Sequence, residues 1–290
     1  MQEVHCSFYK KINELDDGTY SIARYHAISE VPKLALWKQD IFTVLGRDLP
    51  RQKNREIIFY GEWKENIYKK RKSLQFHAER FKVLLPETKE AIQEVLADEV
   101  PGIGKKTAKA IVDAFGTDTF HVLKEPPKHE TIPRIKLMAV RNFIKAEERK
   151  ERLCYLMGTY DLKKGQARKV LKAFGEDATE MLDANIYNLY KAGISLADIE
   201  MNHEPSEEEK NDTIRIRCGI YSAITRLCKN KGHTFIYEND LINETYYVMH
   251  KSVPKATIMF ALDYFKSQLV DESIVYEDGK FFLQEYYDAE

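Results

Sequence analysis

The sequence predicts an α+β protein in which a β-barrel, an array of helices and a smaller mixed domain follow one another. Three observations indicate this order. Residues 1–85 hold β-branched and aromatic runs, 86–201 hold helical segments interrupted by glycine, and 202–290 read as helix, strand, two helices and hairpin. A length of 290 residues suits two or three domains. The chain is 43% hydrophobic and 31% charged, which favours a buried core over wholesale disorder.

The net charge of −1 conceals a segregation of charge along the chain. Residues 64–72 and 163–172 are basic, whereas 198–209 and 271–290 are acidic. A nearly neutral protein binds nucleic acid through such local basic patches.

The composition also bears on compartment, membranes and metals. The four cysteines are scattered without a CxxC pair, which favours reduced thiols in a cytoplasmic protein. No signal peptide or long apolar run is present, so we expect no membrane partner. No zinc-ligand spacing or carboxylate cluster stands out, and we expect no metal site.

The first 85 residues predict five short strands separated by turn residues. The predicted strands are Val4–Tyr9, Tyr20–Ala27, Ile41–Leu45, Ile57–Trp63 and Leu74–Leu85. Five strands in this length favour an OB-like barrel, a fold that commonly binds nucleic acid on one face. Residues 64–72 predict a basic hairpin loop whose Lys69, Lys70, Arg71 and Lys72 are possible phosphate contacts. A solvated turn is the alternative for this loop.

The segment Val100–Ala108 has the pattern of a helix-hairpin-helix, with predicted helices at 87–99 and 105–115. Gly102 and Gly104 permit a tight turn, and Ile103 would pack between the helices. Unpaired N–H groups at the start of the second helix favour phosphate. The predicted DNA-binding residues are Gly102, Ile103, Gly104, Lys105, Lys106 and Thr107.

Two other interpretations of this segment were weighed. A nucleotide-binding P-loop requires a glycine where Glu99 stands and Ser or Thr where Lys106 stands, so the spacing excludes it. A tight αα turn without any ligand remains the alternative. Contacts to the DNA backbone rather than to base edges predict binding with little sequence preference.

Further hairpin-like segments follow along residues 132–195. Ile132–Val140 predicts a degenerate hairpin with Arg134 and Lys136 in place of glycines, and Tyr160–Leu171 predicts another. The endings Ala114-Phe115-Gly116 and Ala173-Phe174-Gly175 indicate an internal repeat. Possible secondary DNA contacts are Arg134, Lys136, Lys163 and Lys164, with packing or a solvated helix face as the alternatives. Tyr190–Ser195 predicts a reduced hairpin that keeps one glycine.

The C-terminal third predicts a winged-helix-like domain after a polar, acidic stretch at 202–211. Helices are predicted at 213–231, 238–250 and 255–269, with a strand at 233–236. A hairpin over 273–283 turns at Asp278-Gly279, a pair typical of a type I′ turn. The acidic residues of this hairpin favour docking on protein over docking on DNA.

The order of these motifs resembles the N-terminal, pre-motor region of RecD-like superfamily 1 DNA helicases, related to the exodeoxyribonuclease V alpha chain. The motifs that carry the resemblance are Phe42–Gly46, Gly61–Trp63, Leu85–Thr88, Pro101–Gly104 and Gly232–Thr234. It covers nearly the whole chain and implies domains at 1–85, 86–201 and 202–290, the last leading toward a helicase motor.

The resemblance implies a non-catalytic DNA-binding module of an ATP-dependent, 5′-to-3′ helicase of DNA repair and recombination. No GxxxxGK[ST] frame occurs in the chain, so we expect the chain alone to be no enzyme and to carry no cofactor. ATP and Mg are expected only for motor domains of the same polypeptide, which would be its partners besides DNA.

Two other functions compete with this one. RuvA-like junction-binding proteins also join an OB-like barrel to helix-hairpin-helices, but they need two intact hairpins and the sequence offers one. A protein-interaction scaffold with vestigial hairpins is favoured by the low net charge and the acidic C-terminal residues. A nuclease is disfavoured, because no carboxylate cluster has metal-site spacing.

Overall fold

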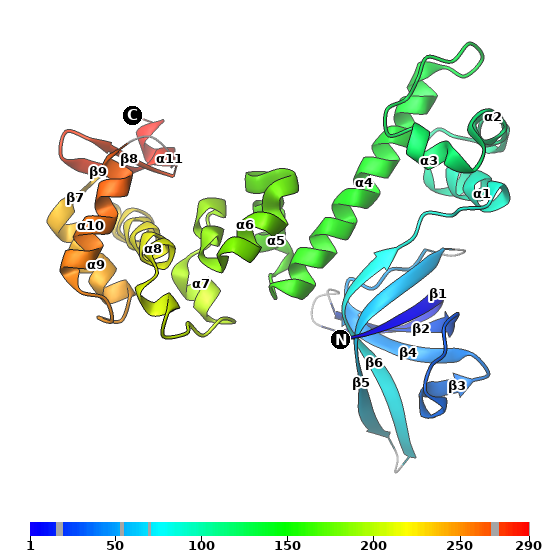
Figure 1. Ribbon diagram of the computed structural model, residues 1–290, viewed down its shortest axis with the longest axis horizontal. Coiled ribbons are helices and arrows are strands. Elements are labelled where there is room, and N and C mark those ends of the chain that lie inside the picture. Colours follow the sequence, from blue (N-terminus) through cyan, green and yellow to red (C-terminus); the bar gives the residue numbers. More distant parts are fainter. Residues whose placement is uncertain (16–19, 53–54, 69–70, 268–272, 290) are drawn as a thin grey trace. The chain divides into compact units, whose positions relative to one another are not determined.

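The computed structural model describes residues 1–15, 20–52, 55–68, 71–267 and 273–289 (Figure 1). Its internal contacts divide the chain into two compact units, Met1–Tyr160 and Asp161–Glu290. Each unit is described by itself. The division of the chain at 85/86 and 201/202 stays a prediction.

The strands of the first unit alternate inward and outward residues, as a barrel requires. Along β2, Ser21, Ala23 and Tyr25 are buried and the residues between them are not. All five predicted strands form, and a short sixth, β3, was not predicted. The strands are β1 (Gln2–Leu15), β2 (Tyr20–Ala27), β3 (Leu36–Lys38), β4 (Ile41–Arg47), β5 (Glu56–Tyr68) and β6 (Arg71–Val83), with a 3-10 helix, η1 (Lys33–Ala35), before β3.

Five of these strands close into a barrel. β1 pairs antiparallel with β2 and β5, and β5 pairs antiparallel with β6. β6 runs parallel to β4, and β4 pairs antiparallel with β2, which completes the ring, while β3 pairs with β4. Its core contains the rings of Tyr25, Phe42, Phe59 and Phe76. The predicted barrel is thereby confirmed.

Strands β5 and β6 extend beyond the rest of the barrel as a two-stranded ribbon (Figure 1). Residues 64–68 and 71–72 therefore lie in strands, and the predicted basic hairpin loop over 64–72 is wrong for them. The pairing of Tyr68 with Arg71 leaves only Lys69 and Lys70 between the strands, and these two lie outside the described residues.

The helices of the first unit pack around a second core, which includes Ile92, Leu96, Ile103, Ile111 and Leu137. Thr88 caps α1 by accepting a hydrogen bond from the Ala91 N–H at 3.4 Å. The predicted limits of α2 are confirmed, but residues 134–140 of the predicted hairpin at 132–140 belong to a long continuous helix, α4. The helices are α1 (Lys89–Glu99), α2 (Lys105–Phe115), α3 (Thr119–Val122) and α4 (Arg134–Thr159), with a 3-10 helix, η2 (Gly116–Asp118), before α3.

The barrel is fixed to these helices by a buried arginine. Arg55, just before β5, has no exposed side-chain surface, and its Nη1 lies 3.2 Å from Glu99 of α1 and 2.6 Å from Glu147 of α4. Its Nε donates to the Leu84 carbonyl oxygen at 3.1 Å. One guanidinium thus joins the barrel to two helices.

A close backbone contact adds to this junction. A β-carbon on Gly158 of α4 would lie 2.4 Å from the Glu79 carbonyl oxygen of β6. Only glycine permits α4 to approach the strand this closely.

The second unit is helical with a small antiparallel sheet, in which β9 pairs with both β7 and β8. Its helices are α5 (Lys164–Phe174), α6 (Ala178–Ala184), α7 (Leu196–Glu200), α8 (Thr213–Lys231), α9 (Glu238–Val248), α10 (Lys255–Lys266) and α11 (Gln284–Tyr287). Its 3-10 helices are η3 (Gly175–Asp177), η4 (Ile186–Ala192) and η5 (Glu209–Asn211). Its strands are β7 (Ile236–Tyr237), β8 (Ile274–Glu277) and β9 (Lys280–Leu283).

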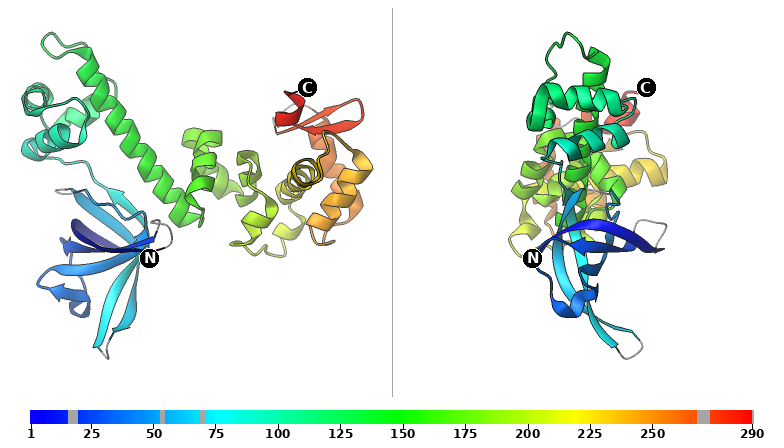
Figure 2. Two further views of the ribbon diagram at one scale, coloured as in Figure 1. Left: turned by 180° about the vertical axis from the view of Figure 1, so that it is seen from behind. Right: turned by 90° about the vertical axis from the view of Figure 1, so that its right-hand side faces the viewer.

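From α8 onward the elements follow the predicted order of helix, strand, two helices and hairpin (Figure 2). Asp278 and Gly279 both have positive φ, 48° and 77°, as a type I′ turn requires. The winged-helix-like assignment itself stays a prediction. Within the described residues, no helix combines the length and the apolar character needed to cross a membrane.

Candidate nucleic-acid interface

The predicted hairpin between α1 and α2 forms a tight turn, Gly102–Ile103–Gly104, called turn 1 here. Gly102 is left-handed, with φ of 78°, and the Ile103 side chain is buried in the helical core. Gly104 is the N-cap of α2, and its carbonyl oxygen accepts the Ala108 N–H at 2.9 Å. The first N–H groups of α2, from Lys105 onward, have no intrahelical acceptor and point toward the start of the helix.

The two glycines of turn 1 have different roles, which the sequence did not separate. Gly102 needs glycine, because side chains disfavour its positive φ. Gly104 is extended, with φ of −92° and ψ of 171°, and a β-carbon there would meet nothing within 4 Å. Any residue can therefore adopt the backbone of Gly104.

The basic residues that follow turn 1 are exposed. Lys105 and Lys106 occupy the first turn of α2 and are solvent-exposed, whereas Thr107 is partly buried. A phosphate at the start of α2 would meet helix N–H groups, the positive end of the helix dipole and two ammonium groups together.

Lys136 lies on turn 1 as well. Its Nζ donates to the Gly102 carbonyl oxygen at 2.7 Å, although the two residues are 34 positions apart. The predicted degenerate hairpin at 132–140 is not formed, because no helix directly precedes Pro133, the N-cap of α4. Arg134 is exposed in the first turn of α4. The structure thus brings Lys136 to the primary predicted site instead of to a second one.

A second turn of the same geometry lies at Asp161–Leu162–Lys163, called turn 2, directly before α5. Asp161 has φ of 48°, Leu162 is 5% exposed, and the Lys163 carbonyl oxygen accepts the Ala167 N–H at 2.9 Å. Each residue stands 59 positions after its counterpart in turn 1. A non-glycine residue holds the left-handed position, which is why the sequence revealed no intact hairpin here. Lys163 and Lys164, two possible DNA contacts, begin α5 at this turn.

The repeat continues beyond the turns. Gly116 and Gly175 end α2 and α5 with φ of 61° and 58°, and each is followed by a 3-10 helix and then another helix. Phe115 and Phe174 precede these glycines with nearly identical backbone angles. The internal repeat inferred from the paired endings is present in the backbone.

A third turn, Gly193–Ile194–Ser195, called turn 3, precedes α7. Gly193 has φ of 75°, Ile194 is 2% exposed, and the Ser195 hydroxyl accepts the Asp198 N–H at 3.2 Å. The reduced hairpin predicted at 190–195 therefore keeps the backbone pattern of the other two turns.

A side chain caps the carbonyl of the left-handed residue in every one of these turns. Asn202 donates to the Asp161 carbonyl oxygen at 3.2 Å, and Lys169 Nζ lies 3.5 Å from the Gly193 carbonyl oxygen. Asn202 follows the helix of turn 3, and Lys169 lies on the helix of turn 2. Turns 2 and 3 thus stabilise each other reciprocally.

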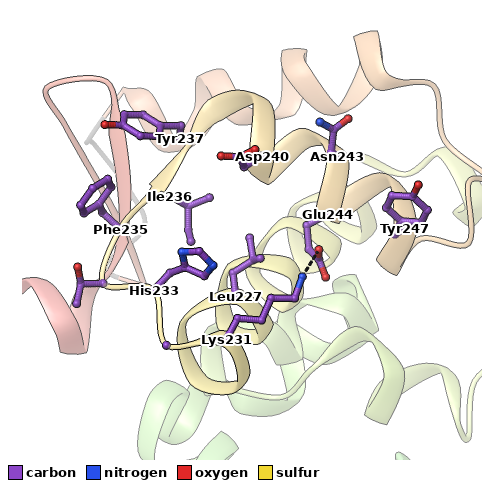
Figure 3. Close-up of a pocket in the computed structure, with 12 residues that line it drawn as sticks. Leu227, Lys231, His233, Phe235, Ile236, Tyr237, Asp240, Asn243, Glu244 and Tyr247 are labelled. Atoms are coloured by element: carbon purple, nitrogen blue, oxygen red, sulfur yellow. Dashed lines mark hydrogen bonds and ion pairs between the residues drawn. The ribbon is translucent and has the colours of Figure 1, made fainter.

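The second unit also contains a cavity of about 690 Å³ around the loop 232–235. Its wall includes the aromatic side chains Phe235, Tyr237 and Tyr247 (Figure 3). Glu244 there binds Lys231 at 3.0 Å, and Asp240 adds a second carboxylate. Because Lys231 is paired with Glu244 and Asp240 adds a negative charge, the cavity lacks the positive charge that binding of a phosphate backbone requires.

The described residues contain no cluster of three or more His, Cys, Asp or Glu side chains suited to a metal ion. The basic ribbon residues Arg71 and Lys72 are exposed at the start of β6, and Lys72 Nζ lies 3.6 Å from Glu65. The structure does not show them converging with turn 1.

The comparison with known families concerns turns 2 and 3. Residues 146–235 match the family model of the ATP-dependent RecD2 DNA helicase HHH domain. This match supports a RecD-like helicase N-terminal region. The RecD2-matched segment includes turn 2, turn 3 and the whole of α8, and it begins after turn 1.

Proposed function

We propose that this chain is the non-catalytic DNA-binding module of an ATP-dependent RecD-like DNA helicase and holds the DNA backbone without sequence preference. The RecD2 match supports the association with a DNA helicase. The observation that carries backbone binding is turn 1, where left-handed Gly102 and buried Ile103 precede Lys105 and Lys106 at the start of α2. Further properties of this helicase follow from the resemblance alone. They are the unwinding polarity, a role in DNA repair or recombination, the use of ATP and Mg, and motor domains in the same polypeptide.

The residues that begin the helix after each turn separate the turns that would contact DNA from the one that would not. Lys105 and Lys106 begin α2 after turn 1, and Lys163 and Lys164 stand at the start of α5. Lys136 and Lys169 cap turns 1 and 3 alike and do not distinguish them. The first turn of α7 holds Leu196, Ala197 and Asp198, without a basic residue. We therefore assign phosphate contact to turns 1 and 2, and a packing role to turn 3.

The remaining parts fit this function. The strand pairing of the barrel, with one parallel pair among antiparallel ones, supports the OB-like assignment, and such barrels commonly bind nucleic acid. The element order after residue 212 supports a winged-helix-like domain, whose acidic hairpin residues Glu277 and Asp278 favour contact with protein.

A RuvA-like, junction-binding function is the second candidate. Turns 2 and 3 favour it, because they supply the additional hairpin geometry that the sequence seemed to lack. A four-way junction presents several backbones at once, so a junction-binding protein prefers it to a linear duplex.

Fluorescence anisotropy with three unrelated duplexes and one four-way junction tests both functions. For the helicase module we expect equal affinities for the duplexes and a linear fall of log K with log salt concentration, because each phosphate contact releases a counterion. Affinity that does not change with salt, or a strong preference for one duplex, would contradict backbone binding. A preference of about tenfold or more for the junction, near 1.4 kcal/mol, would favour the RuvA-like function.

A further inference from the structure

Among the barrel side chains that the structure describes, the aromatic rings of Trp37 of β3 and Tyr9 of β1 are exposed. Trp37 is 47% exposed and Tyr9 is 41% exposed, whereas Tyr25, Phe42, Phe59 and Phe76 are completely buried. The packing of the barrel core does not explain why these two rings are exposed.

Each exposed ring contacts a basic side chain of β2. The Arg24 guanidinium carbon lies 3.6 Å from the Trp37 ring centroid, and the His26 ring lies 5.0 Å from the Tyr9 ring. Arg24 and His26 are two positions apart and flank buried Tyr25, so they share the outer face of β2. The two aromatic-basic pairs are therefore neighbours on one face.

The charge of this face is predominantly positive. Lys38 Nζ lies 4.6 Å from the Trp37 ring centroid, and exposed Lys10 stands opposite Arg24 in the β1–β2 register. Asp40 brings a carboxylate to the face, where it contacts His26 Nδ1 at 2.9 Å. Within the described part of the chain, the Nε of Arg24 has no hydrogen-bond partner.

We propose that this outer face of the barrel, centred on Trp37 and Arg24, binds single-stranded nucleic acid. Bases stack on Trp37 and Tyr9, while Arg24, Lys38 and Lys10 contact the phosphates. Exposed aromatic rings beside cations form the platform on which proteins stack unpaired bases without sequence readout. A duplex keeps its bases stacked inside, so this face discriminates against it.

The barrel site and turn 1 consist of different residues and would bind different ligands, unpaired bases and a phosphate backbone respectively. Turn 1 offers N–H groups and ammonium groups to a backbone, and it has no exposed aromatic ring among Gly102–Thr107. The barrel face offers rings for unpaired bases. The two sites therefore predict different effects of their variants on single-stranded and duplex DNA.

The first experiment uses the fluorescence of Trp37 itself. The chain has two tryptophans, and Trp63 packs against Phe42 and Phe76, so Trp63→Phe in the full chain leaves Trp37 as the single tryptophan. Titration with oligo(dT) is expected to quench its emission to saturation, while a duplex at equal phosphate concentration leaves it nearly unchanged. Absence of quenching, or equal quenching by the duplex, would overturn the proposal.

The second experiment compares Trp37→Leu with Trp37→Phe by anisotropy of labelled oligo(dT). We expect the Leu variant to lose about tenfold in single-strand affinity and the Phe variant to keep most of it, because stacking needs a ring. Circular dichroism melts establish that both variants fold. Equal loss in the two variants would contradict stacking.

The Lys105→Ala/Lys106→Ala variant separates this inference from the proposed function. It should retain the quenching of Trp37 by oligo(dT) while losing duplex affinity. If oligo(dT) quenches Trp37 but duplex affinity is unchanged, only the proposed role of turn 1 is contradicted. If duplex affinity is lost but oligo(dT) does not quench Trp37, only the proposed barrel site is contradicted.

Discussion

Lys136 Nζ donates to the Gly102 carbonyl oxygen at 2.7 Å and so joins the first turn of α4 to the left-handed residue of turn 1. An ammonium group has three donors, and this bond uses one of them. The others remain for a phosphate at the same turn. Lys136 therefore both stabilises the turn and adds to its charge.

Lys136→Met is expected to affect both stability and DNA binding. It keeps the aliphatic chain but removes the donor to Gly102, so the free energy of unfolding should fall by about 1 kcal/mol or less. Loss of the charge should reduce the slope of log K against log salt by about 1. The control, Arg134→Met, should reduce the slope without lowering stability. Equal melting curves for Lys136→Met and wild type would show that the bond is dispensable.

Replacement of Lys105 and Lys106 by alanine should weaken duplex binding and reduce the salt slope by about 2, one for each cation. Stability should hardly change, because both lysines are exposed. The matched control replaces Lys128 and Lys145, exposed lysines of the same unit, and gives the same net charge. If the control weakens binding equally, the effect comes from net charge and not from turn 1.

Gly102→Ala and Gly104→Ala should differ in stability. Gly102 has φ of 78°, so alanine there should cost about 1–2 kcal/mol. Gly104 has an extended backbone and open space, so alanine there brings no strain and should cost below about 1 kcal/mol, as a poorer N-cap than glycine. Urea unfolding of the two variants measures the difference. Similar losses would mean that the turn constrains Gly104 in a way its backbone angles do not reveal.

Gly158→Ala should destabilise the first unit, because the new β-carbon would lie 2.4 Å from the Glu79 carbonyl oxygen. We expect a loss of about 1–3 kcal/mol, typical of overpacking. Gly165→Ala is the control in another helix, α5, where a β-carbon meets nothing within 4 Å. It should stabilise by up to about 1 kcal/mol through helix propensity. Thermal unfolding followed by circular dichroism checks both, and a neutral Gly158→Ala would refute the close contact.

Arg55→Met should destabilise the first unit at neutral pH, by up to about 3–5 kcal/mol, because partly buried Glu99 loses its Arg55 partner while Glu147 keeps Lys150. Burial raises the pKa of Glu99 despite the attraction of Arg55. Burial also opposes ionisation of Glu147, but Lys150 and Arg55 together hold its pKa below the ordinary value.

Arg55 stabilises the folded state only while these carboxylates are ionised. Its contribution is therefore lost as pH falls through the folded-state pKa of each carboxyl group. For Glu99 that pKa lies above the ordinary value for Glu, about 4.3, and for Glu147 it lies below that value. The destabilisation by Arg55→Met should shrink between pH 7 and pH 3.5 in urea unfolding. The control, Arg51→Met, removes an exposed ion pair with Glu14 and should cost below about 1 kcal/mol. A loss that is constant with pH would contradict the role of the carboxylates.

Local signals predicted most elements of the fold. Alternating apolar residues identified the five barrel strands, and glycine at 116 and 232 marked the ends of α2 and α8. The sequence pattern mispredicts the limits of α4, because Pro133 fits a hairpin pattern whereas it is the N-cap of a 26-residue helix. Nothing in residues 141–147 interrupts a helix, and this continuity was the missed signal.

The candidate site was only partly visible in the sequence. Gly102–Ile103–Gly104 identified turn 1 because glycine is the usual left-handed residue. The outline at Tyr160–Leu171 predicted a turn at the place of turn 2, but Asp161 gave no sign of the left-handed position, since a left-handed aspartate has no signature of its own. The bond from Lys136 to Gly102 depends on tertiary packing across 34 positions, which no local pattern encodes. The repeated Ala-Phe-Gly endings, 59 residues apart, were a second clue to turn 2 and to its register against turn 1.

The guanidinium of Arg55 has a mechanical consequence if turn 1 holds DNA as proposed. A pull on turn 1 passes into α1 and α4, and both helices are fastened to the barrel through Glu99 and Glu147. The load is therefore shared by the two ion pairs of Arg55, by the close contact of Gly158 with β6 and by the chain between β6 and α1.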